Sequence, residues 1–101
     1  MEIEIIREAE EFILDLPIKD RAKIKTELDL LRIMGLDYPH LRPIEGKLWE
    51  IKIRDIRLFY FMRESSLAII CGYVKKTAKT PTQEKERALR IMARLSGGVN
   101  K

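Results

Sequence analysis

The feature that most constrains the fold is a change in the spacing of apolar residues near position 48. In residues 48–54 apolar and charged side chains alternate, and residues 56–63 keep the same period of two. This is the pattern of β-strands that turn one face toward a core. Residues 67–74 are apolar at almost every position, as in a central strand covered on both faces. Short polar turns separate the three segments. The pattern therefore predicts an antiparallel meander of three strands.

Two segments before these strands have helical spacing instead. Apolar residues predict helices over residues 3–16 and 18–34, and Pro17 ends the first because proline disfavours the α conformation in the residue before it. Ile3 and Ile5 also alternate with glutamates, so a short N-terminal strand remains an alternative for the first residues. Because the break between the helices is only a few residues long, we expect them to pair as an antiparallel hairpin.

A third helix is expected after the strands. Thr80 has the side chain of an N-cap, Pro81 suits the first helical position, and Gln83 completes a capping-box pattern. The order helix, helix, three strands, helix predicts an α+β fold, in which the N-terminal helical hairpin packs on the sheet and a C-terminal helix follows. A length of 101 residues suits a single domain over residues 1–101.

The two parts of the chain carry opposite net charge. Residues 1–40 hold 10 acidic and 6 basic side chains, whereas residues 41–101 hold 6 acidic and 14 basic ones. A basic region of this kind suits a polyanion such as RNA, although a solvated basic face has the same composition. Charge by itself leaves both interpretations open.

Composition argues against several classes of protein. The single Cys71 cannot form an internal disulfide, and the acidic N-terminus precedes no long apolar run, so we expect a cytoplasmic protein without a membrane segment. Cys71 and His40 cannot supply a tetrahedral metal site by themselves, and His40 is expected in a loop or core role. Paired strand carboxylates and glycine-rich phosphate loops are absent from the sequence. We therefore expect neither a metal ion nor a cofactor.

The remaining candidates for chemistry are cationic side chains near the ends of the predicted strands. In a meander these ends adjoin, and lysines and arginines gathered there bind phosphates. Aromatic strand residues offer surfaces on which RNA bases stack. The candidate cations are Lys52, Arg54, Arg57, Lys75, Lys76 and Lys79, and the candidate aromatic residues are Tyr60, Tyr73 and Phe61.

Three runs of residues resemble a known family. They are GKLWEIKIR from Gly46, IRLFYF from Ile56 and GYVKKTAKTP from Gly72. These runs resemble the RelE/ParE toxin superfamily, most closely its HigB-like, phage-associated branch. The resemblance covers residues from about 12 to 95 in the same order of elements.

The resemblance implies a fold, an activity and a partner. Its members pack N-terminal helices on a curved antiparallel sheet with a cationic concave face. They are typically endoribonucleases that cut mRNA in the ribosomal A site, and a helix-turn-helix antitoxin from the adjacent gene neutralises them. The strand lysine and arginine of the family correspond to Lys52 and Arg57, and its basic loop corresponds to residues 75–79. Many relatives have histidine where this sequence has Cys71, so the proton-transfer residue is not carried over.

The candidate residues suit metal-independent RNA cleavage, in which the 2′-hydroxyl attacks the adjacent phosphate. Arg57 is expected to clamp that phosphate because a guanidinium can bind two phosphoryl oxygens, with Lys52 and Lys76 as further charges. A lysine, Tyr73 or Tyr60 remain open as the groups that move protons. Two alternatives also remain: a ParE-like poison of DNA gyrase and a catalytically inactive nucleic-acid-binding module.

Overall fold

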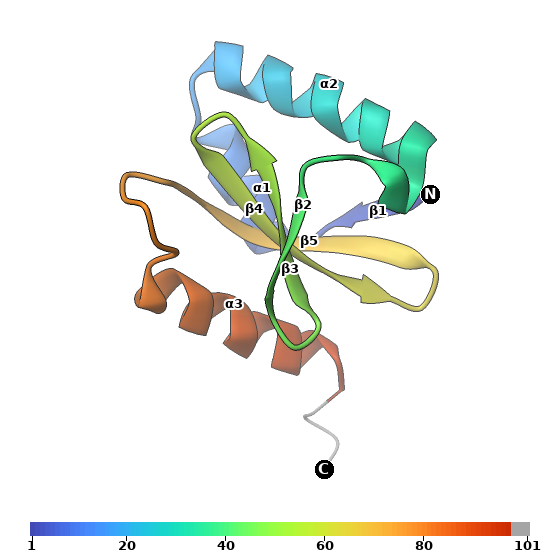
Figure 1. Cartoon of the computed structure of the whole chain (residues 1–101), viewed down its shortest axis with the longest axis vertical. Helices are drawn as coiled ribbons and strands as arrows, with labels where there is room; N and C mark the ends of the chain where they lie inside the picture. The colour runs from blue at the N-terminus through green and yellow to red at the C-terminus, as the bar shows by residue number, and fades with distance from the viewer. Residues whose placement is uncertain (98–101) are drawn as a thin grey trace.

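A five-stranded sheet with helices on both faces forms the body of the protein (Figure 1). The computed structural model describes residues 1–97, so the last four residues of the expected domain lie outside the described part. In chain order the elements are β1 (Glu2–Ile5), α1 (Arg7–Leu14), α2 (Ile18–Met34), the 3-10 helix η1 (Gly35–Asp37), β2 (Leu41–Glu45), β3 (Leu48–Ile53), β4 (Ile56–Arg63), β5 (Ser66–Val74) and α3 (Thr82–Leu95). The expected α+β class is confirmed.

The strand order β1-β5-β4-β3-β2 contains the predicted meander and adds a strand at each edge. The central three strands pair antiparallel, as the alternation predicted. At one edge β2 pairs antiparallel with β3, and its Pro43 fits there because proline, which lacks an N–H, is tolerated on edge strands. At the other edge β1 pairs parallel with β5, which makes the sheet mixed. Neither edge strand was among the three predicted.

The N-terminal strand corrects the expected helix over residues 3–16 and confirms the alternative of a short strand at its start. Residues 2–5 pair with β5, and α1 begins only at Arg7. The free edge of β5 explains the difference, because its unpaired backbone groups need partners that a helix cannot supply. The start of α3 also differs from the prediction. Its N-cap is Pro81 without a side-chain cap, and the Thr80 hydroxyl instead accepts a hydrogen bond from Arg42 Nη2 at 3.2 Å.

The two faces of the sheet support two separate apolar cores. One core lies under α1 and α2 and includes Ile51, Leu58 and Ile69. The other lies under α3 and includes Phe59 and Ile70. Residues adjacent in sequence enter different cores because successive strand side chains point to opposite faces. Within residues 1–97, no helix is long and apolar enough to cross a membrane.

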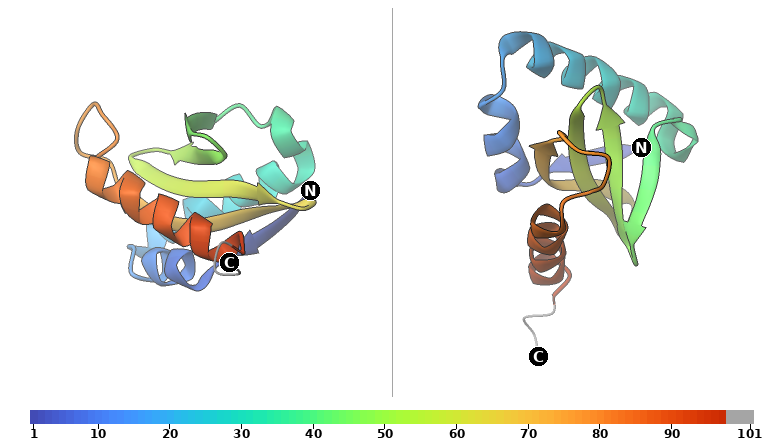
Figure 2. Two further views of the ribbon diagram at one scale, coloured as in Figure 1. Left: turned by 90° about the horizontal axis from the view of Figure 1, so that it is seen from below. Right: turned by 60° about the vertical axis from the view of Figure 1, so that its left-hand side comes forward.

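The N-terminal helices do not form the expected antiparallel pair. The turn after α1 sets α2 at a wide angle to it, as Figure 2 shows. Helix α1 instead lies directly on β5, where Gly72 permits the approach of the Phe12 ring. A Cβ added at Gly72 would lie 2.7 Å from two ring carbons of Phe12 and 2.8 Å from a methyl carbon of Leu58. Close contact with the sheet thus takes precedence over contact between the helices.

An ion pair between α1 and α3 gives a testable dependence of stability on pH. Arg94 Nη2 lies 2.8 Å from Glu8 Oε2, and this hydrogen bond lowers the pKa of Glu8. A lowered pKa means that the pair stabilises the fold above the ordinary carboxyl pKa and ceases to do so as the pH falls through the lowered value. We expect Glu8→Gln to reduce the free energy of unfolding at pH 7 by less than about 1 kcal/mol, since Arg94 is half exposed.

The difference in the free energy of unfolding between wild type and Glu8→Gln should shrink as the pH falls from about 5 toward 1. Urea denaturation followed by circular dichroism at several pH values measures it. A difference that stayed constant over this range would show that the Glu8 charge does not contribute.

Candidate nucleic-acid interface

Strand pairing brings three of the expected site residues into one row across the sheet. Lys52 of β3 lies opposite Arg57 of β4, which lies opposite Tyr73 of β5. Directly opposed residues of neighbouring strands share a face, so the three side chains stand side by side on the face that carries α3. A neighbouring row contains Arg42, Glu50, Phe59 and Cys71.

A cleft of about 370 Å³ opens where these rows meet the loop after β5. Its lining contains four cationic side chains and one carboxylate, which makes it a suitable site for an anion. Three of its charged or titratable residues were not among the predicted site residues. The polar and charged lining residues are His40, Arg42, Glu50, Lys52, Arg57 and Lys75.

Arg57 is held rigidly in the wall of this cleft. The residue is only 8% exposed, and its Nη1 donates to the main-chain oxygens of Arg54 at 2.6 Å and of Ile56 at 3.0 Å. These two bonds tie the guanidinium to the β3–β4 turn, where Arg54 adopts a positive φ of 57°. A guanidinium fixed in this way needs little reorganisation to meet a phosphate.

Glu50 is the buried acid of the cleft and is 1% exposed. Its Oε2 accepts hydrogen bonds from Arg42 Nε at 3.0 Å and Nη2 at 2.6 Å, and lies 3.7 Å from Arg57 Nε. Within residues 1–97, five buried side-chain nitrogen or oxygen atoms lack a hydrogen-bond partner, and three of them belong to the two rows. These three are Glu50 Oε1, Arg57 Nε and Tyr73 Oη. Because unpartnered buried polar atoms are costly, the two donors among them, Arg57 Nε and Tyr73 Oη, indicate groups that an anionic ligand would satisfy.

Two residues near the cleft differ in their capacity to move a proton. Burial raises the pKa of the Tyr73 hydroxyl, so Tyr73 stays protonated at neutral pH and can act as a donor. Burial also raises the pKa of the Cys71 thiol to about 12. Cys71 lies in the core under α3, where a neutral thiol is a packing group.

The loop cations are arranged unequally around the cleft. Lys75 lines it, and its backbone N–H donates to the main-chain oxygen of Asp55 at 2.6 Å. Lys76 and Lys79 are exposed on the loop and are not part of the cleft lining. Arg54 is exposed in the β3–β4 turn and lines a smaller neighbouring pocket that also contains Lys52 and His40. None of the four lysines Lys52, Lys75, Lys76 and Lys79 forms an ion pair with another residue of the described chain.

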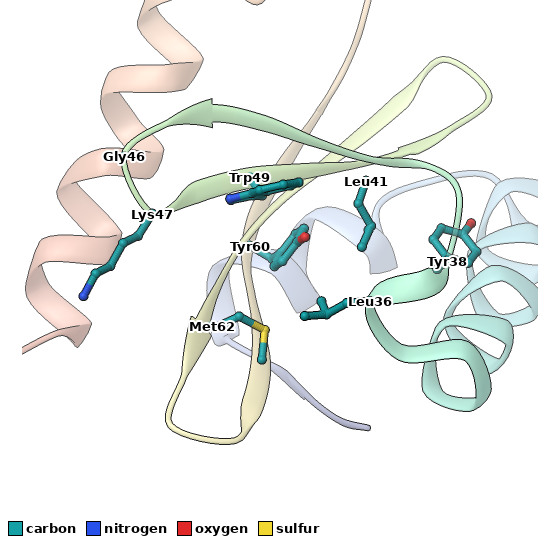
Figure 3. Close-up of a pocket in the computed structure, with 8 residues that line it drawn as sticks. All are labelled: Leu36, Tyr38, Leu41, Gly46, Lys47, Trp49, Tyr60 and Met62. Carbon is teal, nitrogen blue, oxygen red and sulfur yellow. The ribbon is translucent and has the colours of Figure 1, made fainter.

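Tyr60 does not join this site, which corrects its expected role beside the cations. It pairs with Trp49 and Ile69 and lies on the opposite face of the sheet, in the core under α1 and α2. There it lines a separate, mainly apolar pocket of about 580 Å³, in which Figure 3 shows it next to Trp49 and Met62. Phe61 is buried under α3 and offers no stacking surface. The two-residue period of β4 separates Tyr60 from Arg57, three positions earlier.

Glu50 and Arg42 line the cleft but were not predicted as site residues. Glu50 alternates with Lys52 on one face of the first predicted strand, so a charged residue at this position was detectable. Arg42 gave no such signal, because the run around Pro43 lacks the alternation of a strand. Within residues 1–97, no cluster of three or more His, Cys, Asp or Glu side chains is arranged to hold a metal ion.

Comparison with solved structures defines the class of this fold as that of RelE toxins. An archaeal RelE in complex with RelB from Pyrococcus horikoshii OT3 superposes with a TM-score of 0.62 at 15% identity, over 76% of this chain and 97% of the other. The isolated Escherichia coli RelE toxin gives a TM-score of 0.60 at 16% identity, over 89% of this chain and 97% of the other. Identities this low establish a shared fold.

The family itself follows from the sequence. The profile described as "Phage derived protein Gp49-like (DUF891)" matches residues 11–93. The chain therefore belongs to the phage-derived Gp49-like family. No curated protein matches the sequence significantly.

Proposed function

We propose that this protein is the toxin of a type II toxin–antitoxin pair, of the HigB-like branch, and that it inhibits translation in the cytoplasm by cutting mRNA on the ribosome. The observation that carries the proposal is the cleft of Lys52, Arg57 and Lys75 beside buried polar atoms without partners. An anion with several acceptor oxygens would pair with these cations and accept from two of those atoms, Arg57 Nε and Tyr73 Oη, and an RNA phosphate is such an anion. The RelE-like fold and the Gp49-like family support the toxin assignment.

The proposed reaction needs no metal ion. The 2′-hydroxyl oxygen of the RNA attacks the adjacent phosphorus, the bond from phosphorus to the 5′-oxygen breaks, and a 2′,3′-cyclic phosphate and a 5′-hydroxyl result. Arg57, Lys52 and Lys75 stabilise the negative charge that builds up on the phosphoryl oxygens. Tyr73 is the proposed donor of the proton to the leaving 5′-oxygen, since burial keeps its hydroxyl protonated and strand pairing places it next to Arg57. His40 lies on the cleft wall and is the proposed acceptor of the 2′-hydroxyl proton.

The more exposed cations have a supporting role in this proposal. Arg54, Lys76 and Lys79 lie outside the cleft lining and are solvent-exposed, which suits contacts with flanking phosphates of a longer RNA. The proposed protein partner is a helix-turn-helix antitoxin encoded by the neighbouring gene. Copurification of both proteins from a two-gene plasmid tests for that partner.

Cleavage in a bacterial translation extract tests the activity. We expect the purified protein to produce new mRNA 5′ ends, mapped by primer extension, only while translation proceeds. Lys52→Ala is expected to lower the cleavage rate about 10-fold or more, because it removes a charge beside the reacting phosphate. Lys19→Ala removes another exposed lysine, from α2, and is expected to cleave at the wild-type rate.

Intact mRNA during active translation would contradict the nuclease proposal. Gyrase-linked DNA breaks in cells that express the protein, with mRNA uncut, would instead support a gyrase poison. Toxicity and cleavage that both persist in Lys52→Ala would show that the cleft is not the site of the reaction.

A further inference from the structure

Arg42 lies at the open edge of the cleft and is held there by the buried Glu50. The two residues are opposite each other in the pairing of β2 with β3. Although 51% of the Arg42 side chain is exposed, two of its nitrogens donate to one carboxylate oxygen of Glu50, at 3.0 and 2.6 Å. A free arginine on an edge strand would sample many rotamers, and this double contact restricts it to one.

The same arginine also connects the sheet to the basic loop. Arg42 Nη2 donates to the Thr80 hydroxyl at 3.2 Å, at the end of the segment that carries Lys75, Lys76 and Lys79. Arg42 Nη1 makes no hydrogen bond with another residue in the described part of the chain. Two nitrogens of this guanidinium thus hold it in position, and the third can bind a ligand.

The contacts of Glu50 suit a positioning residue better than a base. A carboxylate that is 1% exposed needs cationic partners, and its Oε2 lies between the guanidinium groups of Arg42 and Arg57. One buried oxygen therefore sets the position of both arginines. The contacts of this oxygen are with the two arginines, so Glu50 acts through them.

We propose that Glu50 is a positioning residue that holds Arg42 as an additional RNA-phosphate ligand, next to the phosphate at Lys52 and Arg57. This inference rests on the proposed function, since it takes single-stranded RNA as the ligand of the cleft. Arg42 binds the neighbouring phosphate through its free Nη1. Glu50 acts through the arginine and does not contact the RNA.

A double-mutant cycle with Arg42→Gln, Glu50→Gln and both together tests the proposal. Each glutamine can keep a hydrogen bond while the charge is lost, and the double variant retains an amide pair in the cleft. We expect each single variant to lower the cleavage rate in the translation extract by about 10- to 100-fold. The double variant should be no slower than Glu50→Gln, because Arg42 is no longer held at the phosphate once Glu50 is replaced.

The salt dependence of RNA binding gives a readout that a merely structural role would not change. The probe is a short fluorescent single-stranded oligoribonucleotide, and its affinity is measured from low to moderate salt. Loss of one phosphate contact should reduce the slope of log affinity against log salt by about 0.7 in Arg42→Gln. Arg90→Ala, which removes an exposed arginine from α3, should leave the slope unchanged.

Three results would overturn the proposal. The first is an Arg42→Gln variant with the wild-type slope and cleavage rate. The second is a further loss of cleavage when Arg42→Gln is added to Glu50→Gln, which would mean that Arg42 contributes without being held by Glu50. The third is an unchanged affinity and slope in Glu50→Gln. If wild type binds the oligoribonucleotide but cuts no mRNA, the nuclease proposal fails while the binding measurements still decide the role of Arg42.

Discussion

Replacing Arg57 with alanine is expected to slow mRNA cleavage by about 10²- to 10³-fold, the size of effect seen when one preorganised donor to a transition-state anion is removed. The guanidinium lies between Lys52 and Tyr73 in the row that crosses the sheet. Its burial strengthens its attraction to added negative charge, because water screens it poorly. Its bonds to two main-chain oxygens fix its orientation before RNA binds.

Two further variants separate charge from geometry and from folding. Arg57→Lys keeps the charge but cannot reproduce the guanidinium fork, so we expect it to recover only part of the activity. Arg63→Ala, at the far end of the same strand, removes a partly exposed arginine and should cleave at the wild-type rate. Urea denaturation of each variant shows whether it is folded at the assay temperature. A folded Arg57→Ala protein that cleaves normally would refute the role given to this residue.

Phe59→Ala is expected to cause the largest loss of stability, about 3–5 kcal/mol in the free energy of unfolding. The side chain is fully buried under α3, and its ring stacks on that of Tyr73 with centroids 5.5 Å apart. Its removal loses apolar burial and leaves a cavity that the rigid sheet cannot fill. Because domains of this size are stable by only about 5–15 kcal/mol, the variant should be close to unfolding at 37 °C.

Trp49 provides the matched control for this measurement. Its side chain is larger than that of Phe59, but it is 36% exposed and lies on the other face of the sheet. We expect Trp49→Ala to cost less than Phe59→Ala, since the free energy follows the area removed from water and not the size of the residue. Equal losses in urea denaturation would mean that the core under α3 is less tightly packed than its burial indicates.

The spacing of apolar side chains within single segments predicted part of the fold. Alternation in residues 48–63 predicted two strands, and the expected meander brought together the strand ends that carry Lys52 and Arg57. The second helix agrees with its expected range of 18–34. Each of these features depends on the spacing of apolar side chains within one segment.

The site was predictable only in part, for the same reason. Lys52 and Arg57 belong to adjacent strands joined by a short turn, so a local pattern was enough to bring them together. Arg42 reaches Glu50 through an edge strand that contains Pro43 and has no alternation. Tyr60 was expected beside the cations although its position in the alternation places it with Trp49, on the other face.

The sequence by itself determined the α+β class, the central meander, the basic character of the second part of the chain and three of the four cations of the cleft. Only the tertiary structure decided the parallel pairing of β1 with β5, the wide angle between α1 and α2, and the meeting of Arg42, Glu50 and Thr80. Edge pairing depends on backbone hydrogen bonds, which every residue except proline can make, so it leaves little trace in the side chains. The cleft combines residues from three separate parts of the chain, and their distances are set by strand register and by the two cores on either side of the sheet.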